Sequence, residues 1–276
     1  MKRILGAAGA AVLGAAIVVG SAPMSVADDR AADFTGIVAL DNCSGSVVRT
    51  PSAADADPAL VLSNGHCYTF MGADEVVVNE PANRSFTLLD AAGSDAGTLT
   101  ATQLSYATMK DTDVSLYQLD ITYGELASEY GSTALTLADT RPTEGTSFSV
   151  VSGYWQEIYD CSVNGFVHQL KEADWTWSDS IRYDDASSCQ TIGGTSGSPL
   201  VDGAGKVIGI NNTGNDNGEE CTLNNPCEVD GAGNVTVKPG TKYGQQTYLM
   251  VPCIGQGSVI DLDAAGCALP KPTGLA

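Results

Sequence analysis

A serine in the last third of the chain has neighbours that suit nucleophilic chemistry. Ser196 is the third residue of Gly-Thr-Ser-Gly-Ser-Pro, which begins at Gly194. A serine hydroxyl is a weak nucleophile at neutral pH, so it needs an adjacent base and amide donors for the oxyanion that forms on attack. Glycine at 194 and 197 permits a tight turn and a close approach to a substrate carbonyl. The backbone amides of Gly194 and Ser196 are therefore the candidate oxyanion hole.

Glycine- and serine-rich strings are also common in plain turns, so the candidate base decides the interpretation. The chain has two histidines, His66 and His168, and both precede Ser196. An α/β-hydrolase places its histidine after the serine and uses Gly-x-Ser-x-Gly, whereas Ser198 stands here in place of the last glycine, so that class is excluded. A subtilisin order starting from Asp41 would require long helical patterns, which the sequence lacks. The order that remains is histidine, aspartate, serine.

The base and its orienting acid are each predicted at the end of a strand. His66 closes the run Ala-Leu-Val-Leu-Ser-Asn-Gly-His, which predicts a strand followed by a turn that exposes the imidazole. Asp113 opens the alternating run Asp-Val-Ser-Leu-Tyr-Gln-Leu, where its carboxylate would accept a hydrogen bond from imidazole Nδ1. Asp111 is the alternative acid, but it lies in a Lys-Asp-Thr-Asp turn and would be held less rigidly. His168 lies in a strand-like run, residues 161–170, and is expected to be a packed or edge residue.

Four segments resemble, in order and spacing, the signature blocks of the chymotrypsin/trypsin (S1) superfamily of serine endopeptidases. They are Cys-Ser-Gly-Ser-Val-Val from Cys43, Asn-Gly-His-Cys at His66, Asp-Val-Ser-Leu from Asp113, and Gly-Thr-Ser-Gly-Ser-Pro-Leu around Ser196. The resemblance covers about residues 34–255. It implies an all-β fold of two antiparallel six-stranded barrels with the active site in the cleft between them. It also implies a general base at 66, an orienting acid at 113 and a nucleophile at 196 that forms an acyl-enzyme.

The serine segment is closest in form to the secreted bacterial V8/glutamyl-endopeptidase-like group. In the digestive enzymes of the superfamily, an aspartate before the nucleophile pairs with the new N-terminal ammonium after zymogen cleavage. This chain has Thr195 at that place, so activation by such an ion pair is not expected. The glutamyl endopeptidases recognise an acidic side chain of the substrate with a histidine in a later strand. This chain has Asn211 at the corresponding position. The resemblance therefore does not carry acid specificity over to this chain.

The substrate pocket that the resemblance implies has neutral polar walls. Because it contains no carboxylate, a preference for Lys or Arg is not expected. Two alternatives to a serine endopeptidase stay open from the sequence: a non-catalytic, protease-like binding or adhesion protein, and an esterase that uses the same three residues. The expected pocket residues are Gln190, Thr191, Asn211, Asn212 and Gly214.

The N-terminus predicts export. Residues 1–27 have the pattern of a secretory signal peptide, with Lys2 and Arg3 followed by an apolar stretch at 4–19 and the small-residue cleavage site Ser25-Val26-Ala27. A membrane anchor is the weaker alternative, because the apolar run is short and rich in small residues. We therefore expect a secreted, extracellular protein with no membrane association after signal cleavage.

Eight cysteines in an exported chain predict four disulfides. A zinc site is the alternative for the closely spaced pair at 221 and 227, but no histidine lies nearby and the compartment is oxidising. The resemblance independently implies a disulfide between Cys43 and Cys67. Proximity in sequence suggests the pairs Cys43 with Cys67, Cys161 with Cys189, Cys221 with Cys227, and Cys253 with Cys267.

The chain is strongly acidic, with 33 acidic and 13 basic residues and a formal net charge of −20. Signal cleavage would remove two of the basic residues. Such a charge argues against nucleic acid or an anionic membrane as partner. We expect a monomer that acts on protein or peptide substrates without cofactor or metal. Hard oxygen ligands gather in residues 215–220 and could hold calcium, but a solvated surface loop is the preferred interpretation.

Short alternating runs separated by Gly, Asn, Asp and Pro predict an all-β protein, with one helical turn at 123–130. Residues after Cys267 are expected to be loose. The strands are expected at 75–78, 85–89, 147–151, 206–210 and 247–251. The expected organisation is a signal peptide at 1–27, a short leader at 28–34, an N-terminal barrel at 35–140, a C-terminal barrel at 141–255 joined to it near 139–145, and a disulfide-linked tail at 256–276.

Overall fold

The computed structural model describes residues 32–183 and 187–273. The expected signal peptide and most of the expected leader lie outside the described residues. Within them, no helix is both long enough and apolar enough to cross a membrane. The helices are α1 Gly65–Tyr68 and α2 Tyr123–Tyr130, with 3-10 helices at Ser187–Cys189, Val251–Cys253 and Gln256–Ser258.

Strands dominate the described part of the chain. They are β1 Ile37–Ala39, β2 Ser44–Arg49, β3 Pro58–Ser63, β4 Val76–Pro81, β5 Ser85–Leu89, β6 Asp95–Thr108, β7 Val114–Thr122, β8 Leu135–Leu137, β9 Ser147–Ser152, β10 Glu157–Glu172, β11 Trp175–Tyr183, β12 Pro199–Asp202, β13 Lys206–Gly214, β14 Cys227–Val229, β15 Val235–Val237 and β16 Lys242–Gln246.

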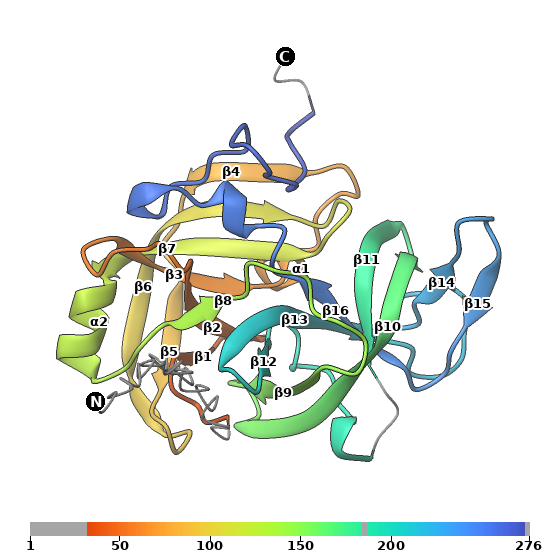
Figure 1. Cartoon of the computed structure of the whole chain (residues 1–276), viewed down its shortest axis with the longest axis horizontal. Coiled ribbons are helices and arrows are strands. Elements are labelled where there is room, and N and C mark those ends of the chain that lie inside the picture. The colour runs from red at the N-terminus through yellow and green to blue at the C-terminus, as the bar shows by residue number, and fades with distance from the viewer. Residues whose placement is uncertain (1–31, 184–186, 274–276) are drawn as a thin grey trace, which may run out of the picture.

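The strands close into two antiparallel six-stranded barrels (Figure 1). The first barrel runs β1-β5-β6-β7-β3-β2 and closes through the pairing of β1 with β2. The second runs β13-β12-β9-β10-β11-β16 and closes through the pairing of β13 with β16. Between them, β8 pairs in parallel with β2 and with β13, so it joins the two barrels. The predicted fold class is confirmed.

Alternation of side chains explains why the predicted strands form. In β5, Phe86 and Leu88 are fully buried while Ser85 is exposed and Thr87 only partly buried, as expected for one face on the core. The runs at 75–78, 147–151 and 206–210 lie largely within β4, β9 and β13, and the helical turn at 123–130 is α2. Thr122 caps α2 through a capping box with Glu125.

The predicted strand at 247–251 is wrong. Met250 donates its backbone N–H to the Thr247 carbonyl in a turn, and a 3-10 helix follows at Val251–Cys253. Pro252 has no N–H for a strand ladder, and its fixed φ suits the start of a helix. The last strand of the second barrel is instead β16, which precedes this segment.

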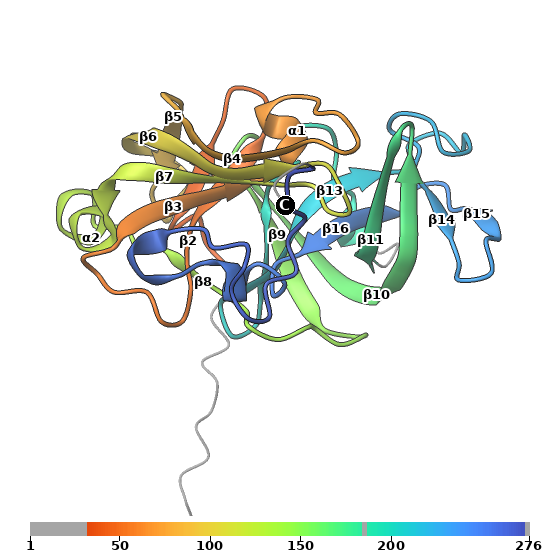
Figure 2. The ribbon, with the colours of Figure 1, turned by 90° about the horizontal axis from the view of Figure 1, so that it is seen from above.

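The C-terminal segment returns to cover the first barrel, as Figures 1 and 2 show. Met250, Ile260 and Leu269 pack in one apolar cluster with side chains of β3, β6 and β7. The Tyr106 hydroxyl donates to the Pro270 carbonyl at 2.8 Å. The expectation of a loose tail is wrong for these residues, because removing apolar surface from water fixes the segment on the barrel.

All eight cysteines form disulfides, and the four predicted pairs are confirmed. They are Cys43–Cys67 in the first barrel, Cys161–Cys189 and Cys221–Cys227 in the second, and Cys253–Cys267 within the C-terminal segment.

Candidate active site

One cleft brings together side chains from both barrels. His66 and Phe70 of the first barrel line it, and Ser196, Asn212 and Thr213 of the second barrel line it from the other side. The two candidate residues that are 130 positions apart in the chain thus face a common space. Helix α1, which follows β3, carries His66, and the loop between β11 and β12 carries Ser196. Both segments lie where the two barrels meet.

His66 and Asp113 form a close pair. Imidazole Nδ1 lies 2.7 Å from Asp113 Oδ2, and the His66 backbone N–H donates to Asp113 Oδ1 at 3.0 Å. The carboxylate is fully buried, whereas 18% of the His66 side chain stays exposed. A carboxylate bound to Nδ1 fixes the tautomer that leaves Nε2 free to accept a proton. This geometry is consistent with the prediction that Asp113, and not Asp111, orients the imidazole.

The ends of β3 and β7 hold this pair in place. Asp113 directly precedes β7, and the Asn64 side chain after β3 donates to the Asp113 carbonyl at 2.8 Å. The Ser115 hydroxyl donates back to the Asn64 carbonyl at 2.7 Å. Gly65 begins the short helix α1, and a Cβ there would lie 2.2 Å from the Thr108 carbonyl oxygen. Only glycine therefore fits at the position before the histidine.

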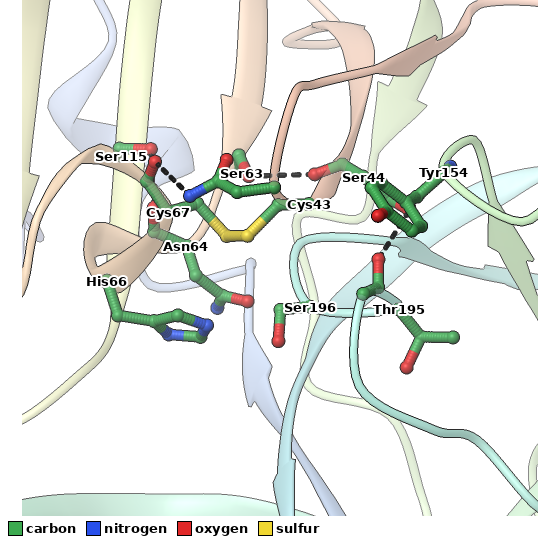
Figure 3. Close-up of a disulfide and its surroundings, with 12 residues drawn as sticks. Cys43, Ser44, Ser63, Asn64, His66, Cys67, Ser115, Tyr154, Thr195 and Ser196 are labelled. Atoms are coloured by element: carbon green, nitrogen blue, oxygen red, sulfur yellow. Dashed lines mark hydrogen bonds between the residues drawn. A yellow bond between two sulfur atoms is a disulfide. The ribbon is translucent and has the colours of Figure 1, made fainter.

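The disulfide Cys43–Cys67 lies beside the imidazole (Figure 3). The two sulfur atoms and a ring nitrogen of His66 lie within 4.8 Å of one another. Because the sulfurs are bonded to each other, they offer no thiolate for metal ligation. The bridge instead ties the start of β2 to the helix that carries His66.

The surroundings raise the pKa of His66 above its ordinary value of 6.5. Burial alone would lower that pKa, but the charge of Asp113 and its hydrogen bond to the ring outweigh burial, and the charge of Glu172 adds a smaller contribution in the same direction. An imidazole with a raised pKa is a stronger base, provided that the pH is high enough to leave it neutral.

Ser196 stands on the loop between β11 and β12. Its hydroxyl donates to the Asn212 backbone carbonyl at 3.3 Å and makes no hydrogen bond with His66. The Ser196 carbonyl accepts from the Ser44 backbone N–H at 2.8 Å, which ties the loop to β2 of the first barrel. Figure 3 shows His66 and Ser196 beside the disulfide, on segments from different barrels.

The two amides predicted to form an oxyanion hole have no acceptor. Among the described residues, nothing accepts a hydrogen bond from the backbone N–H of Gly194 or of Ser196. By contrast, the amides of Thr195, Gly197 and Ser198 in the same loop donate to backbone carbonyls. Gly194 and Ser196 are both partly buried and lie on either side of Thr195, so their free N–H groups are available to a ligand oxygen.

Thr195 occupies the position at which the digestive enzymes carry an aspartate, and its side chain is satisfied within the loop. The side chain is buried, its hydroxyl donates to the Ile192 carbonyl at 2.5 Å, and Asn211 Nδ2 donates to it at 3.0 Å. A neutral threonine with these partners requires no N-terminal ammonium beside it.

Four of the five predicted pocket residues line the cleft: Thr191, Asn211, Asn212 and Gly214. The fifth, Gln190, is exposed and does not line the cleft. Asn212 is 4% exposed, and neither its amide nitrogen nor its amide oxygen has a hydrogen-bond partner among the described residues.

Several residues of the cleft were not predicted from the sequence. Glu172, at the end of β10, is buried and accepts hydrogen bonds from the Thr213 hydroxyl at 2.6 Å and the Asn224 N–H at 2.8 Å. Burial raises the pKa of this carboxyl group. Phe70 stacks beside the His66 ring with centroids 6.1 Å apart. Lys242 lines the far wall and pairs with Asp216 at 3.0 Å.

The sequence was compared with known families and structures. The profile of the trypsin-like peptidase domain matches residues 43–210, so the chain belongs to the trypsin-like peptidase family. That range includes all three residues of the His66, Asp113 and Ser196 constellation. No curated protein matches the sequence significantly.

Several solved protease structures are similar to this one at low identity. The apo MamO protease domain from Magnetospirillum magneticum is 13% identical, with a TM-score of 0.49 over 79% of this chain and 95% of that one. The active form of the Rv3671c protease from M. tuberculosis is 15% identical, with a TM-score of 0.48 over 96% and 97%. A Glu endopeptidase in complex with MPD is 16% identical, with a TM-score of 0.43 over 83% and 93%.

Proposed function

We propose that the chain is a secreted serine endopeptidase that hydrolyses peptide bonds through an acyl-enzyme. It is a trypsin-like peptidase by family, and the finer statement rests on the cleft. The observation that carries the proposal is the Asp113–His66 pair, at 2.7 Å, facing the same cleft as Ser196. This is the order of groups that activates a serine hydroxyl: acid, imidazole, nucleophile.

The proposed reaction begins with a rotation of the Ser196 hydroxyl. Its hydrogen bond to the Asn212 carbonyl is long at 3.3 Å, and a change of χ1 would turn the hydroxyl toward His66 Nε2. Such contacts are often loose before substrate binds and tighten in the complex. Oγ then attacks the substrate carbonyl carbon while Nε2 takes the hydroxyl proton. The oxyanion that forms accepts hydrogen bonds from the two free amides of the nucleophile loop.

The remaining steps return the protein to its starting state. Imidazolium gives its proton to the leaving amine, the C–N bond breaks, and an acyl-enzyme remains on Ser196. Water then loses a proton to His66 and attacks the ester, and the proton returns to Oγ as the acid product leaves. Asp113 keeps its charge throughout and stabilises the imidazolium in both halves of the reaction.

Secretion and the V8-like grouping belong to the same proposal. Four disulfides support an oxidising compartment, and Thr195 supports a subgroup that matures without a buried ion pair. We propose cleavage after Ala27 and catalytic barrels at about 35–140 and 141–255. The C-terminal segment then serves as a clasp over the first barrel.

The test compares the exported protein with two serine variants on a random peptide library, with fragments identified by mass spectrometry. Ser196→Ala should lower kcat/KM by about 10⁴- to 10⁶-fold. Ser198→Ala is the matched control, because Ser198 is buried two residues away and its hydroxyl has no partner. The control should cleave at nearly the wild-type rate. Equal cleavage by wild type and Ser196→Ala contradicts the proposal.

A further inference from the structure

The loop between β11 and β12, which carries Ser196, contains a tight turn. The type of this turn decides where the Gly194 N–H, one of the two oxyanion donors, points. The Thr195 N–H donates to the Ile192 carbonyl at 3.1 Å, which closes a four-residue turn. Gly194, the third residue, has φ of 91°, and Gly193 is not in the positive-φ region. An i to i+3 hydrogen bond with positive φ only at the third residue defines a type II turn. Glycine suits that position because it has no Cβ.

Type I and type II turns differ by a flip of their central peptide unit, here the unit that joins Gly193 to Gly194. In a trans peptide, the carbonyl and the N–H point in opposite directions. The direction of the Gly193 carbonyl therefore fixes the direction of the Gly194 N–H. In the alternative type I turn the two groups exchange sides, so the carbonyl would point where the free amide now points.

Trp155 holds the Gly193 carbonyl. Its indole Nε1 donates to that oxygen at 2.7 Å, the shortest kind of hydrogen bond expected between neutral groups. Trp155 is 47% exposed, so its side chain contributes little to the core. The tight approach leaves no room for a side chain at 194, since a Cβ there would lie 2.9 Å from the indole nitrogen and 2.8 Å from the Tyr154 ring.

A second contact holds the next carbonyl of the loop. The Ser44 hydroxyl donates to the Gly194 carbonyl at 3.2 Å and accepts from the Tyr154 N–H at 3.1 Å. The backbone N–H of Trp155 donates to the Ser152 hydroxyl. The Ser152 and Ser44 hydroxyl oxygens lie 3.1 Å apart. The segment after β9 and the start of β2 therefore clamp two successive carbonyls, and both amides of the candidate oxyanion hole are left free.

We propose that Trp155 is a positioning residue for the oxyanion hole: its indole N–H holds the 192–195 turn in the type II form. This takes the place of an ion pair to the residue before the nucleophile, which Thr195 is unable to make. The inference rests on the proposed function. Without the indole donor, the central peptide becomes free to flip, and the hole loses the Gly194 donor in most of the molecules.

The test uses Trp155→Phe, which keeps an aromatic ring and removes the N–H donor. Tyr154→Phe is the matched control, because it changes the neighbouring ring on the same loop without removing a hydrogen bond of the described structure. Five quantities are measured for each protein: kcat and KM on a peptide, Ki of a peptide aldehyde, Kd of the same peptide ending in a primary alcohol, and the midpoint of thermal unfolding. Ser196 Oγ adds to the carbonyl carbon of the aldehyde, and the former carbonyl oxygen then occupies the oxyanion hole. The alcohol has no carbonyl group.

Complete removal of one oxyanion donor lowers kcat by about 10²- to 10³-fold, so a variant in which about 90 to 99% of the molecules hold the flipped turn should lose about 10- to 100-fold. We expect Trp155→Phe to lower kcat by that factor and to weaken aldehyde binding in parallel, with KM and alcohol binding changed less than about threefold. A merely structural role would move alcohol binding and the unfolding midpoint as well. Tyr154→Phe should leave all five quantities near wild type.

The outcomes separate the inference from the proposed function. Wild-type kcat and aldehyde binding in Trp155→Phe, in a protein whose activity is lost in Ser196→Ala, overturn the inference alone. A parallel loss of alcohol binding and thermal stability also overturns it, because Trp155 would then support the whole cleft. Full activity in Ser196→Ala overturns the proposed function, and the inference with it.

Discussion

The two halves of the cleft differ in how completely their polar groups are paired. On the first-barrel side, the Asp113 carboxylate accepts two hydrogen bonds from His66, and a disulfide fixes the helix that carries the base. On the second-barrel side, the amides of Gly194 and Ser196 have no acceptor among the described residues. The buried side-chain amide of Asn212 has no partner either.

This difference shows where the substrate has to contribute. Leaving a buried polar group without a partner costs about 1 to 3 kcal/mol, so such groups persist where a ligand completes them. In the proposed mechanism the His66 side is assembled in advance, because its task is to hold one tautomer. The Ser196 side would be completed when a carbonyl oxygen arrives, and donors that bind the oxyanion more strongly than the carbonyl accelerate the reaction.

The strongest way to break the comparison is to remove the base. His66→Ala should lower kcat/KM by about 10⁴- to 10⁶-fold, because loss of the base disables the serine almost as completely as loss of the hydroxyl. His168→Ala is the control, since it removes the only other histidine, which lies exposed on β10. Steady-state peptide hydrolysis by both variants gives the answer. A loss in the control equal to that in His66→Ala would contradict the assignment.

Replacing the orienting acid should have the next largest effect and should also change the pH profile. Asp113→Asn should lower kcat/KM by about 10⁴-fold through loss of the correct tautomer. Asp111→Asn should leave kcat/KM nearly unchanged, because no hydrogen bond joins Asp111 to the imidazole.

The sign of the pH effect follows from the state of the base. His66 acts only when neutral, so kcat/KM rises as the pH increases through its pKa. In the wild type that pKa is raised, and the rise should therefore come above 6.5. The residual activity of Asp113→Asn should rise at lower pH than in the wild type, because the carboxylate that raises the pKa is gone. A rise at unchanged pH would contradict the coupling of the two groups.

Disulfide removal should distinguish the bridge beside His66 from the bridge in the C-terminal segment by stability and activity together. The pair at Cys43–Cys67 spans 24 residues and the pair at Cys253–Cys267 spans 14, so replacing either pair by serines should lower the free energy of unfolding by about 2 to 4 kcal/mol. The longer loop should lose about 0.5 kcal/mol more. Urea unfolding measures both. Only the first change should also lower kcat/KM, because only that bridge lies beside the base.

The smallest expected effect concerns the carboxyl group at the end of β10. Glu172→Gln removes a charge that contributes weakly to the raised pKa of His66, so the rise of kcat/KM with pH should move slightly to lower pH. Glu157→Gln, at the exposed start of the same strand, should leave the profile unchanged. A shift in Glu172→Gln as large as that in Asp113→Asn would show that the two carboxylates act on the base to the same extent.

Local patterns predicted the first barrel well and the last strand poorly. Phe86 and Leu88 in β5 alternate with polar residues, so the strand could be located from its period of two. The last strand, β16, contains Gln245 and Gln246, which are buried but polar. Their side chains donate to Ser180 and Asp179 of the neighbouring strand β11, and such partners have no local signature.

The catalytic candidates could be predicted because each lies at the end of a strand within a distinctive segment. The contacts that position them could not. Trp155 and Gly193 are 38 residues apart, and nothing in either segment indicates that the indole meets that carbonyl. Gln190 was expected in the pocket from its distance to Ser196 along the chain, but the direction of its side chain depends on the path of the loop. Glu172 enters the cleft only because β10 is long enough to reach it.

Labelling with a fluorophosphonate probe tests the central claim most directly, because a serine hydroxyl reacts with it only when a base and an oxyanion hole activate it. The account predicts one probe per protein on Ser196 by mass spectrometry, at a rate that rises with pH through the raised pKa of His66. It predicts no labelling in Ser196→Ala or His66→Ala and full labelling in Ser198→Ala. An unlabelled, folded wild-type protein, or a probe attached to a residue other than Ser196, would contradict the account.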